Sequence, residues 1–161
     1  MPYHFFDIAK DEFWQLSSGS INSFLGNISE WDNYDKHCKR STIHLPENMI
    51  NHMYQLTNLK YPIEIENTVT HYVKYNIDKS YAVDTHDDHC KITIIVYLHR
   101  DDNLCETLTI DDNKIEDNYW ITDAHKYRCM VMWSENDDFG AIHSVDINGD
   151  GNREILCMFL G

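Results

Sequence analysis

The sequence predicts a mainly β protein, an antiparallel barrel or jelly roll with N-terminal helices packed on its outside. From about residue 63 onward, short runs rich in β-branched and aromatic residues alternate with Asp, Asn and Gly clusters. Few helical patterns separate these runs, which favours antiparallel sheets over a sheet built from βαβ units. The length of 161 residues fits one domain, 1–161.

Residues 1–62 are expected to form a helical and irregular support for this β core. One helix stands out there, because Pro46 suits a first-turn position and Pro62 ends the pattern. Apolar residues between the two prolines share one helical face: Met49, Ile50, Met53, Leu56 and Leu59. Such a face indicates a helix that packs against the core.

The region 63–161 is expected to contain six strands, at 68–75, 92–98, 105–110, 127–133, 141–147 and 154–160. The segment 146–154 imitates the start of a calcium loop, but Cys157 stands where such a loop needs a bidentate glutamate. We therefore interpret its Asn148-Gly149-Asp150-Gly151 stretch as the turn of a hairpin between the last two strands.

Charge and composition exclude several classes of function. The formal net charge is −14 and the pI is about 4.9, which argues against a surface that neutralises nucleic-acid phosphates. No apolar stretch is long enough to span a bilayer, and the first residues lack the pattern of a signal peptide. The five cysteines contain no Cys-x-x-Cys pair. We expect a soluble cytoplasmic protein with reduced cysteines.

Two motifs could carry chemistry. In His86-Asp87-Asp88 the first and third side chains point to the same side of an extended segment, so both can reach one ion. His143 is followed ten residues later by Arg153 across the predicted hairpin. Each pattern alone occurs about as often as chance allows, and His99-Arg100-Asp101 is a second His-x-Asp match. Their order and context give them weight.

The motifs occur in a recognisable order. A His-x-Asp stands just before an apolar strand, about 55 residues of β-structure follow, and then come a histidine and an arginine on the last strand. Here the sequence resembles the iron(II) and 2-oxoglutarate-dependent dioxygenases, in particular their prolyl 4-hydroxylase-like branch. The similarity covers roughly residues 68–161. Two further stretches resemble strands of that family, namely Glu106-Thr107-Leu108 and 130–134. The resemblance implies a double-stranded β-helix, a jelly roll of the cupin type.

The resemblance also implies roles for particular residues. His86, Asp88 and His143 would be the catalytic iron ligands, and two imidazoles with one carboxylate leave coordination positions open on iron. Arg153 would bind the distal carboxylate of 2-oxoglutarate, because a guanidinium matches a carboxylate with two hydrogen bonds. Tyr97, in Tyr97-Leu98-His99, would donate a hydrogen bond to the same carboxylate. Asp88 stands where related halogenases carry a small residue, which implies oxygen transfer.

Some positions keep alternatives open. His89 and His99 are rival ligands, although His99 falls where the cosubstrate strand should end. Asp84 and Asp87 are interpreted as solvated or as partners that hold an imidazole tautomer. The turn glycine that the family carries before its His-x-Asp is missing, so Tyr75 or Tyr81 could line the cosubstrate site or could be ordinary strand residues, and Tyr72 has no assigned role. The Gly-Gly of the family's acidic strand, which resembles Glu106-Thr107-Leu108, is also absent, so the entrance geometry and the substrate stay open.

The implied function is an oxygenase that decarboxylates 2-oxoglutarate to succinate and CO2 while hydroxylating a C–H bond. Its implied cofactors are Fe(II) and 2-oxoglutarate, with dioxygen as a substrate and ascorbate as a candidate additional reductant. The expected primary substrate is a prolyl or other residue of a peptide, or a free amino acid. The alternative is a non-catalytic cupin-like β-barrel, a binding or structural module in which His86 and His143 do not meet.

Overall fold

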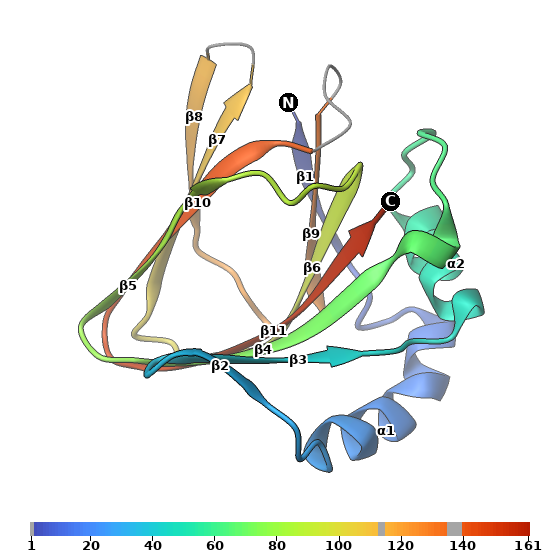
Figure 1. Ribbon diagram of the computed structural model, residues 1–161, viewed down its shortest axis with the longest axis horizontal. Coiled ribbons are helices and arrows are strands. Elements are labelled where there is room, and N and C mark those ends of the chain that lie inside the picture. Colours follow the sequence, from blue (N-terminus) through green and yellow to red (C-terminus); the bar gives the residue numbers. More distant parts are fainter. Residues whose placement is uncertain (1, 113–114, 135–139) are drawn as a thin grey trace.

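The computed structural model describes residues 2–112, 115–134 and 140–161, and these residues form two antiparallel sheets with two helices outside them (Figure 1). The strands are β1 (Tyr3–Asp7), β2 (Asp32–Asp35), β3 (Cys38–Ile43), β4 (Val69–Ile77), β5 (Ser80–His86), β6 (Ile92–Arg100), β7 (Cys105–Asp112), β8 (Ile115–Ile121), β9 (Arg128–Trp133), β10 (Ile142–Asn148) and β11 (Gly151–Leu160). The helices are α1 (Glu12–Gly26), α2 (Glu47–Leu56) and a short 3-10 turn (Ile65–Asn67).

One sheet has seven strands in the order β1-β9-β6-β11-β4-β3-β2, and the other has four in the order β5-β10-β7-β8. Every pairing within these sheets is antiparallel. Consecutive strands therefore often lie in different sheets, as β4 and β5 or β10 and β11 do. This is the jelly-roll, cupin-like arrangement that the sequence predicts, and the mainly β fold class is confirmed.

The central strands of the seven-stranded sheet are buried on both faces. Its inner face packs against the four-stranded sheet through residues such as Ile95, Tyr97 and Ile155. Its outer face packs against α1 and α2 through Ile94, Leu156 and their neighbours. In Figure 1 both helices lie on the side of this sheet that faces away from β5 and β10. Burial on two faces explains why β6 reads as one continuous apolar run.

The two helices are fixed by local sequence. Asp11 caps α1, because its carboxylate accepts a hydrogen bond from the backbone N–H of Trp14 at 3.0 Å. Trp14 is 1% exposed and anchors that helix to the core. In α2 the predicted face is buried through Met49, Ile50 and Met53. Pro46 occupies the N-cap of α2, one position before the predicted first turn, and the helix ends at Leu56.

The helical and irregular support expected in residues 1–62 is present as α1 and α2, but the expectation missed three strands. This region also supplies β1, β2 and β3, and β1 and β3 pair with β9 and β4 respectively. They were missed because they are short, and β2 is exposed along its whole length, so no apolar run marks it. The six predicted strands are all present, but β5 and β8 were also missed.

No helix within the described ranges is long and apolar enough to cross a membrane. The predicted hairpin turn between the last two strands is also present, with Gly149 at a φ of +117°. Asp150 in this turn accepts a hydrogen bond from the backbone N–H of Lys79 at 2.7 Å. The carboxylate of Asp150 therefore connects the β10–β11 turn to the β4–β5 turn at one end of the barrel.

Candidate metal centre

Three of the predicted ligands converge at one point. One ligand atom each from His86, Asp88 and His143 lies within 4.8 Å of the other two. The Nε2 atom of His86 is 3.0 Å from Oδ1 of Asp88, and the Nε2 atom of His143 is 3.6 Å from its Oδ2. Among the residues that the structure describes, no other three His, Cys, Asp or Glu side chains bring one ligand atom each this close together.

Strand pairing brings the two histidines together. His86 ends β5, His143 lies near the start of β10, and the two residues are register partners. Their ring centroids are 4.4 Å apart. The register shifts between His143 and Val145, and such an irregularity re-aims side chains locally. Asp88 follows in the connection from β5 to β6, so the ligands come from two strands and the loop between the sheets.

Backbone carbonyls fix the orientation of both imidazoles. The Nδ1 atom of His86 is 2.7 Å from the carbonyl oxygen of Asp84, and that of His143 is 2.8 Å from the carbonyl oxygen of Ala141. Because a carbonyl only accepts, each Nδ1 must carry a hydrogen. In the neutral ring, Nε2 then presents its lone pair toward Asp88. Three electron-rich atoms facing one another require a cation between them, either a proton or a metal ion.

The carboxylate of Asp88 is fixed by a hydrogen bond, and its surroundings favour the charged form. Thr93 on β6 donates a hydrogen bond from Oγ1 to its Oδ2 at 2.7 Å. Burial tends to raise the pKa of Asp88, but the hydrogen bond from His86 and the charge of His143 outweigh it and lower the pKa below its usual range. Burial lowers the pKa of His143, whereas the hydrogen bond to Asp88 raises the pKa of His86. Burial therefore favours the neutral, coordinating form of His143, whereas the hydrogen bond to Asp88 favours the protonated form of His86.

Neither rival ligand belongs to the convergent group. The His89 ring is 3.1 Å from Asp87, and its side chain is 78% exposed. His99 pairs with Asp101 at 2.7 Å and lines a different cavity from the three convergent ligands. Asp84 does hold the tautomer of His86, but through its backbone carbonyl rather than its carboxylate.

The convergent ligands border a large cavity of about 1160 Å³ between the sheets. β5 lines it along its whole length, from Ser80 to His86. Aliphatic side chains from facing strands, among them Val73, Ile95 and Val145, cover its inner wall. Arg153 borders the same cavity, although this side chain is only 2% exposed. The cavity thus joins the candidate metal centre to the residue predicted to bind a cosubstrate carboxylate.

Arg153 is already paired with a carboxylate of the chain itself. Its Nε and Nη2 donate to the two carboxylate oxygens of Glu106, each at 2.9 Å. Tyr97 donates its hydroxyl hydrogen to Oε2 of Glu106 at 2.6 Å, and it is not among the cavity-lining residues. Arg100 adds a longer contact of 3.4 Å to Oε1. Both residues predicted to hold a cosubstrate therefore hold Glu106.

Glu106 is charged in this environment. Burial tends to raise the pKa of the carboxyl, but the charge of Arg153 and its hydrogen bonds outweigh burial and hold that pKa below its usual range. The side chain is 1% exposed. Glu106 lies on β7 and Arg153 on β11, so this ion pair connects the two sheets across the interior.

The three tyrosines left open by the sequence have different surroundings. Tyr75 lines the large cavity, with Cζ of Arg153 4.9 Å from its ring centroid. Tyr81 also lines it and donates its hydroxyl hydrogen to Asp35 at 2.7 Å. Tyr72 lies in the core beneath the helices and donates to Glu154. Only Tyr75 adjoins both the cavity and Arg153.

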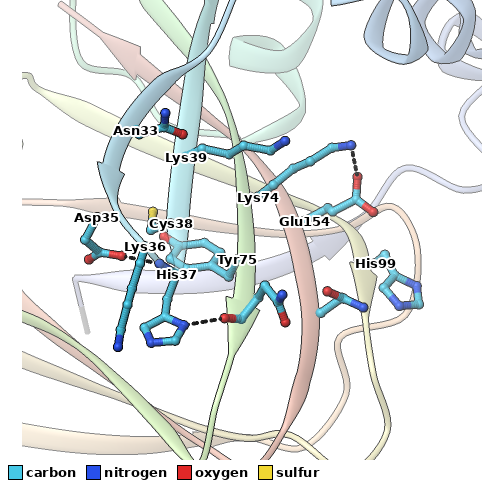
Figure 2. A pocket seen from close by; sticks show the side chains of 12 residues that line it. Asn33, Asp35, Lys36, His37, Cys38, Lys39, Lys74, Tyr75, His99 and Glu154 are labelled. Carbon is cyan, nitrogen blue, oxygen red and sulfur yellow. Dashed lines mark hydrogen bonds and ion pairs between the residues drawn. The ribbon is translucent and has the colours of Figure 1, made fainter.

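A second cavity of about 550 Å³ lies on the other side of the seven-stranded sheet. Figure 2 shows Lys39 and Lys74 reaching over it together, with Lys74 paired to Glu154 and His99 nearby. The two lysines are register partners on β3 and β4, and both ammonium groups lie over the Trp31 ring. This cavity contains no member of the convergent triad.

Comparisons with known proteins support the fold alone. The sequence matches no family model and no curated protein. A Pseudomonas putida prolyl-4-hydroxylase has a similar structure, with a TM-score of 0.62, 12% identity, and 99% of this chain and 92% of that chain covered. IDO from Bacillus thuringiensis has a TM-score of 0.67 and 10% identity, with 99% of this chain and 89% of that chain covered. SnoN, a non-haem α-ketoglutarate-dependent epimerase from nogalamycin biosynthesis, has a TM-score of 0.60 and 12% identity, with 99% of this chain and 77% of that chain covered.

Sequence reasoning missed three contributors to the site. Thr93 is an ordinary threonine in an apolar strand, and only the fold brings its hydroxyl to Asp88. Glu106 was noted as part of an acidic strand, but nothing local pairs it with Arg153, 47 residues away. Arg100 was noted only as the middle residue of a His-x-Asp match.

Proposed function

We propose that this protein is a mononuclear non-haem iron oxygenase that hydroxylates a C–H bond, with iron held by His86, Asp88 and His143. The observation that carries the proposal is the convergence of these three side chains inside a jelly roll. Two imidazoles and one carboxylate on one side of an ion, with other positions open, are typical of non-haem Fe(II) oxygenases. A purely structural metal site would surround its ion completely.

The residues around the ligands suit Fe(II). Each imidazole donates Nδ1–H to a backbone carbonyl, so Nε2 is the atom left to coordinate. Thr93 satisfies one carboxylate oxygen of Asp88, which restricts how that carboxylate can turn. When bound, iron would supply the redox chemistry that activates dioxygen.

The rest of the chain would orient the substrate and keep water out. The cavity is walled by β5 on one side and by the seven-stranded sheet on the other, and its volume exceeds that of one amino acid. A prolyl-4-hydroxylase and an α-ketoglutarate-dependent epimerase share this fold. We propose as substrate a residue of a peptide or a free amino acid, and as cosubstrate a 2-oxo acid. The arrangement around Arg153 does not fit 2-oxoglutarate in the way that the family resemblance implies.

The test is an anaerobic titration of the purified chain with Fe(II), in which calorimetry measures the binding. The wild type should bind one ion, and His143→Ala or Asp88→Ala should weaken binding about 100-fold or more, because each removes a ligand. His99→Ala is the matched control, since it removes a histidine that also has an acidic partner but lies in the other cavity. Equal affinities in all four proteins would contradict the proposal.

A second measurement separates an oxygenase from a non-catalytic binding module. Iron-loaded wild type should consume dioxygen when a 2-oxo acid is added, and the His143→Ala variant should not. A chain that binds iron at the triad but consumes no dioxygen with any 2-oxo acid would favour the cupin-like binding module.

A further inference from the structure

The place expected for a cosubstrate's distal carboxylate is filled by the chain. The resemblance gives that carboxylate two donors, the guanidinium of Arg153 and the hydroxyl of Tyr97. Both donors are bound to Glu106, by two contacts of 2.9 Å and one of 2.6 Å. A bidentate guanidinium contact together with a hydroxyl hydrogen bond is the recognition that a ligand carboxylate would receive.

Glu106 is also firmly held in this place. Its side chain is 1% exposed, and a contact from Arg100 supports it from a position outside the cavity lining. Moving it out would leave the buried guanidinium of Arg153 without its partner, which is strongly unfavourable. The low pKa described above keeps the carboxylate charged at neutral pH.

A second carboxylate at Arg153 would therefore meet a like charge. Two carboxylates that share one buried cation repel each other, and one of them must be protonated or excluded. At separations of a few ångströms this repulsion weakens binding by about tenfold or more. A dicarboxylate such as 2-oxoglutarate is consequently a poor fit for the inner end of this cavity.

The wall between the metal ligands and Arg153 suits an uncharged group. Along β6, Thr93, Ile95 and Tyr97 point inward in succession, because alternate residues of a strand share a face. Between Thr93 and Tyr97, Ile95 lies beside Cys157 of β11, which in turn pairs with His71 of β4. Aliphatic side chains adjoin this layer, namely Ile155 of the same sheet and Val145 of the four-stranded sheet. A chain that starts at the metal and runs inward meets methyl groups before it reaches the paired guanidinium.

We infer that Glu106 is a built-in substitute for the distal carboxylate, and that the iron centre takes as cosubstrate a 2-oxo acid with an uncharged side chain. This inference rests on the proposed function. In the reaction, the C1–C2 bond of the oxo acid breaks and releases CO2. One oxygen atom of O2 enters the resulting carboxylic acid, and the other enters the C–H bond of the substrate. Both the oxo acid and the substrate are oxidised by two electrons, and O2 is reduced by four.

The experiment compares two probes of the same length on anaerobic Fe(II)-loaded protein by calorimetry. These are 2-oxoglutarate and 2-oxopentanoate, which has a methyl group in place of the distal carboxylate. The wild type should bind 2-oxopentanoate about tenfold more tightly than 2-oxoglutarate. Glu106→Gln keeps the size of the side chain and removes its charge, so its affinity for 2-oxoglutarate should rise about tenfold or more while that for 2-oxopentanoate stays within about threefold.

Glu154→Gln is the matched control, because it removes a carboxylate on the outer side of the sheet and should behave as the wild type does. Tighter binding of 2-oxoglutarate by the wild type, an unchanged ratio in Glu106→Gln, or no binding of either acid would overturn the inference. In those cases iron still binds and the proposed metal centre stands. Failure of the iron titration itself would overturn both proposals.

Discussion

Breaking the buried ion pair between Arg153 and Glu106 on one side should strongly destabilise the fold. We consider Arg153→Met, Glu106→Gln and the double variant. Arg153→Met removes both 2.9 Å contacts and leaves Glu106 at 1% exposure with Tyr97 and Arg100 as remaining partners. Breaking a buried pair on one side costs about 3 to 5 kcal/mol, and the two remaining partners place the cost near 3 kcal/mol.

The double variant should lose much less than the two single variants together. Once Arg153 is replaced by methionine, its unpaired guanidinium is gone, and Arg100 keeps its 2.9 Å hydrogen bond to the carbonyl oxygen of Ile121. Glutamine at 106 can still accept the Tyr97 hydroxyl hydrogen. We expect the sum of the single losses to exceed the loss of the double variant by about 2 kcal/mol or more, as for residues in direct contact. In a chain of this size, 3 kcal/mol corresponds to a fall in Tm of about 6 to 12 °C.

Urea unfolding at pH 7, followed by circular dichroism, measures all four proteins. The pH dependence gives a second check. Because the folded-state pKa of Glu106 is lowered, its contribution is present above the unfolded value of about 4.3 and is lost as the pH falls toward the folded value. The stability gap between the wild type and Glu106→Gln should shrink below that pH. Single losses that add to within about 0.5 kcal/mol would refute the coupling.

Three other outcomes can be measured. The pKa of His86 lies above its ordinary value. Iron affinity should be constant above this pKa and fall by about tenfold per pH unit below it, because Fe(II) must displace the proton on the imidazole. An iron affinity that does not change from pH 5 to 8 would contradict this. Thr93→Val should weaken Fe(II) binding by about 10- to 100-fold in calorimetry, whereas Thr93→Ser should bind as the wild type does. Gly140→Ala should destabilise the fold by about 1 to 3 kcal/mol in urea, since φ is +87° and an added Cβ would lie 2.8 Å from the carbonyl oxygen of Cys90, whereas Gly19→Ala in α1, with open space around it, should not destabilise.

Burial on two faces decides which strands could be predicted from the sequence. β6 and β9 are almost wholly buried, so their sequences are continuous apolar runs. β5 alternates between partly buried and exposed residues and carries serine, aspartate and threonine, which are typical of loops. The strand that carries His86 was therefore the least visible one, although the histidine itself was identified.

The candidate ligands were identified through their order in the chain, and their partners were not. His86, Asp88 and His143 stand at spacings that a known family shares, and the fold brings them together. Glu106 follows a cysteine in a polar stretch, where an acid normally faces water. Its burial depends on β7 lying across the interior from β11, and no local pattern encodes that distance.

β5 is an edge strand of its sheet, and among the described strands its backbone ladder runs to β10 alone. It also forms one complete wall of the large cavity and ends at His86. Swinging this wall outward breaks a single ladder, whereas moving β6 or β11 breaks two. The backbone of β5 is therefore held by fewer ladder hydrogen bonds than that of β6, and amide hydrogens along β5 should exchange with deuterium sooner than those of β6.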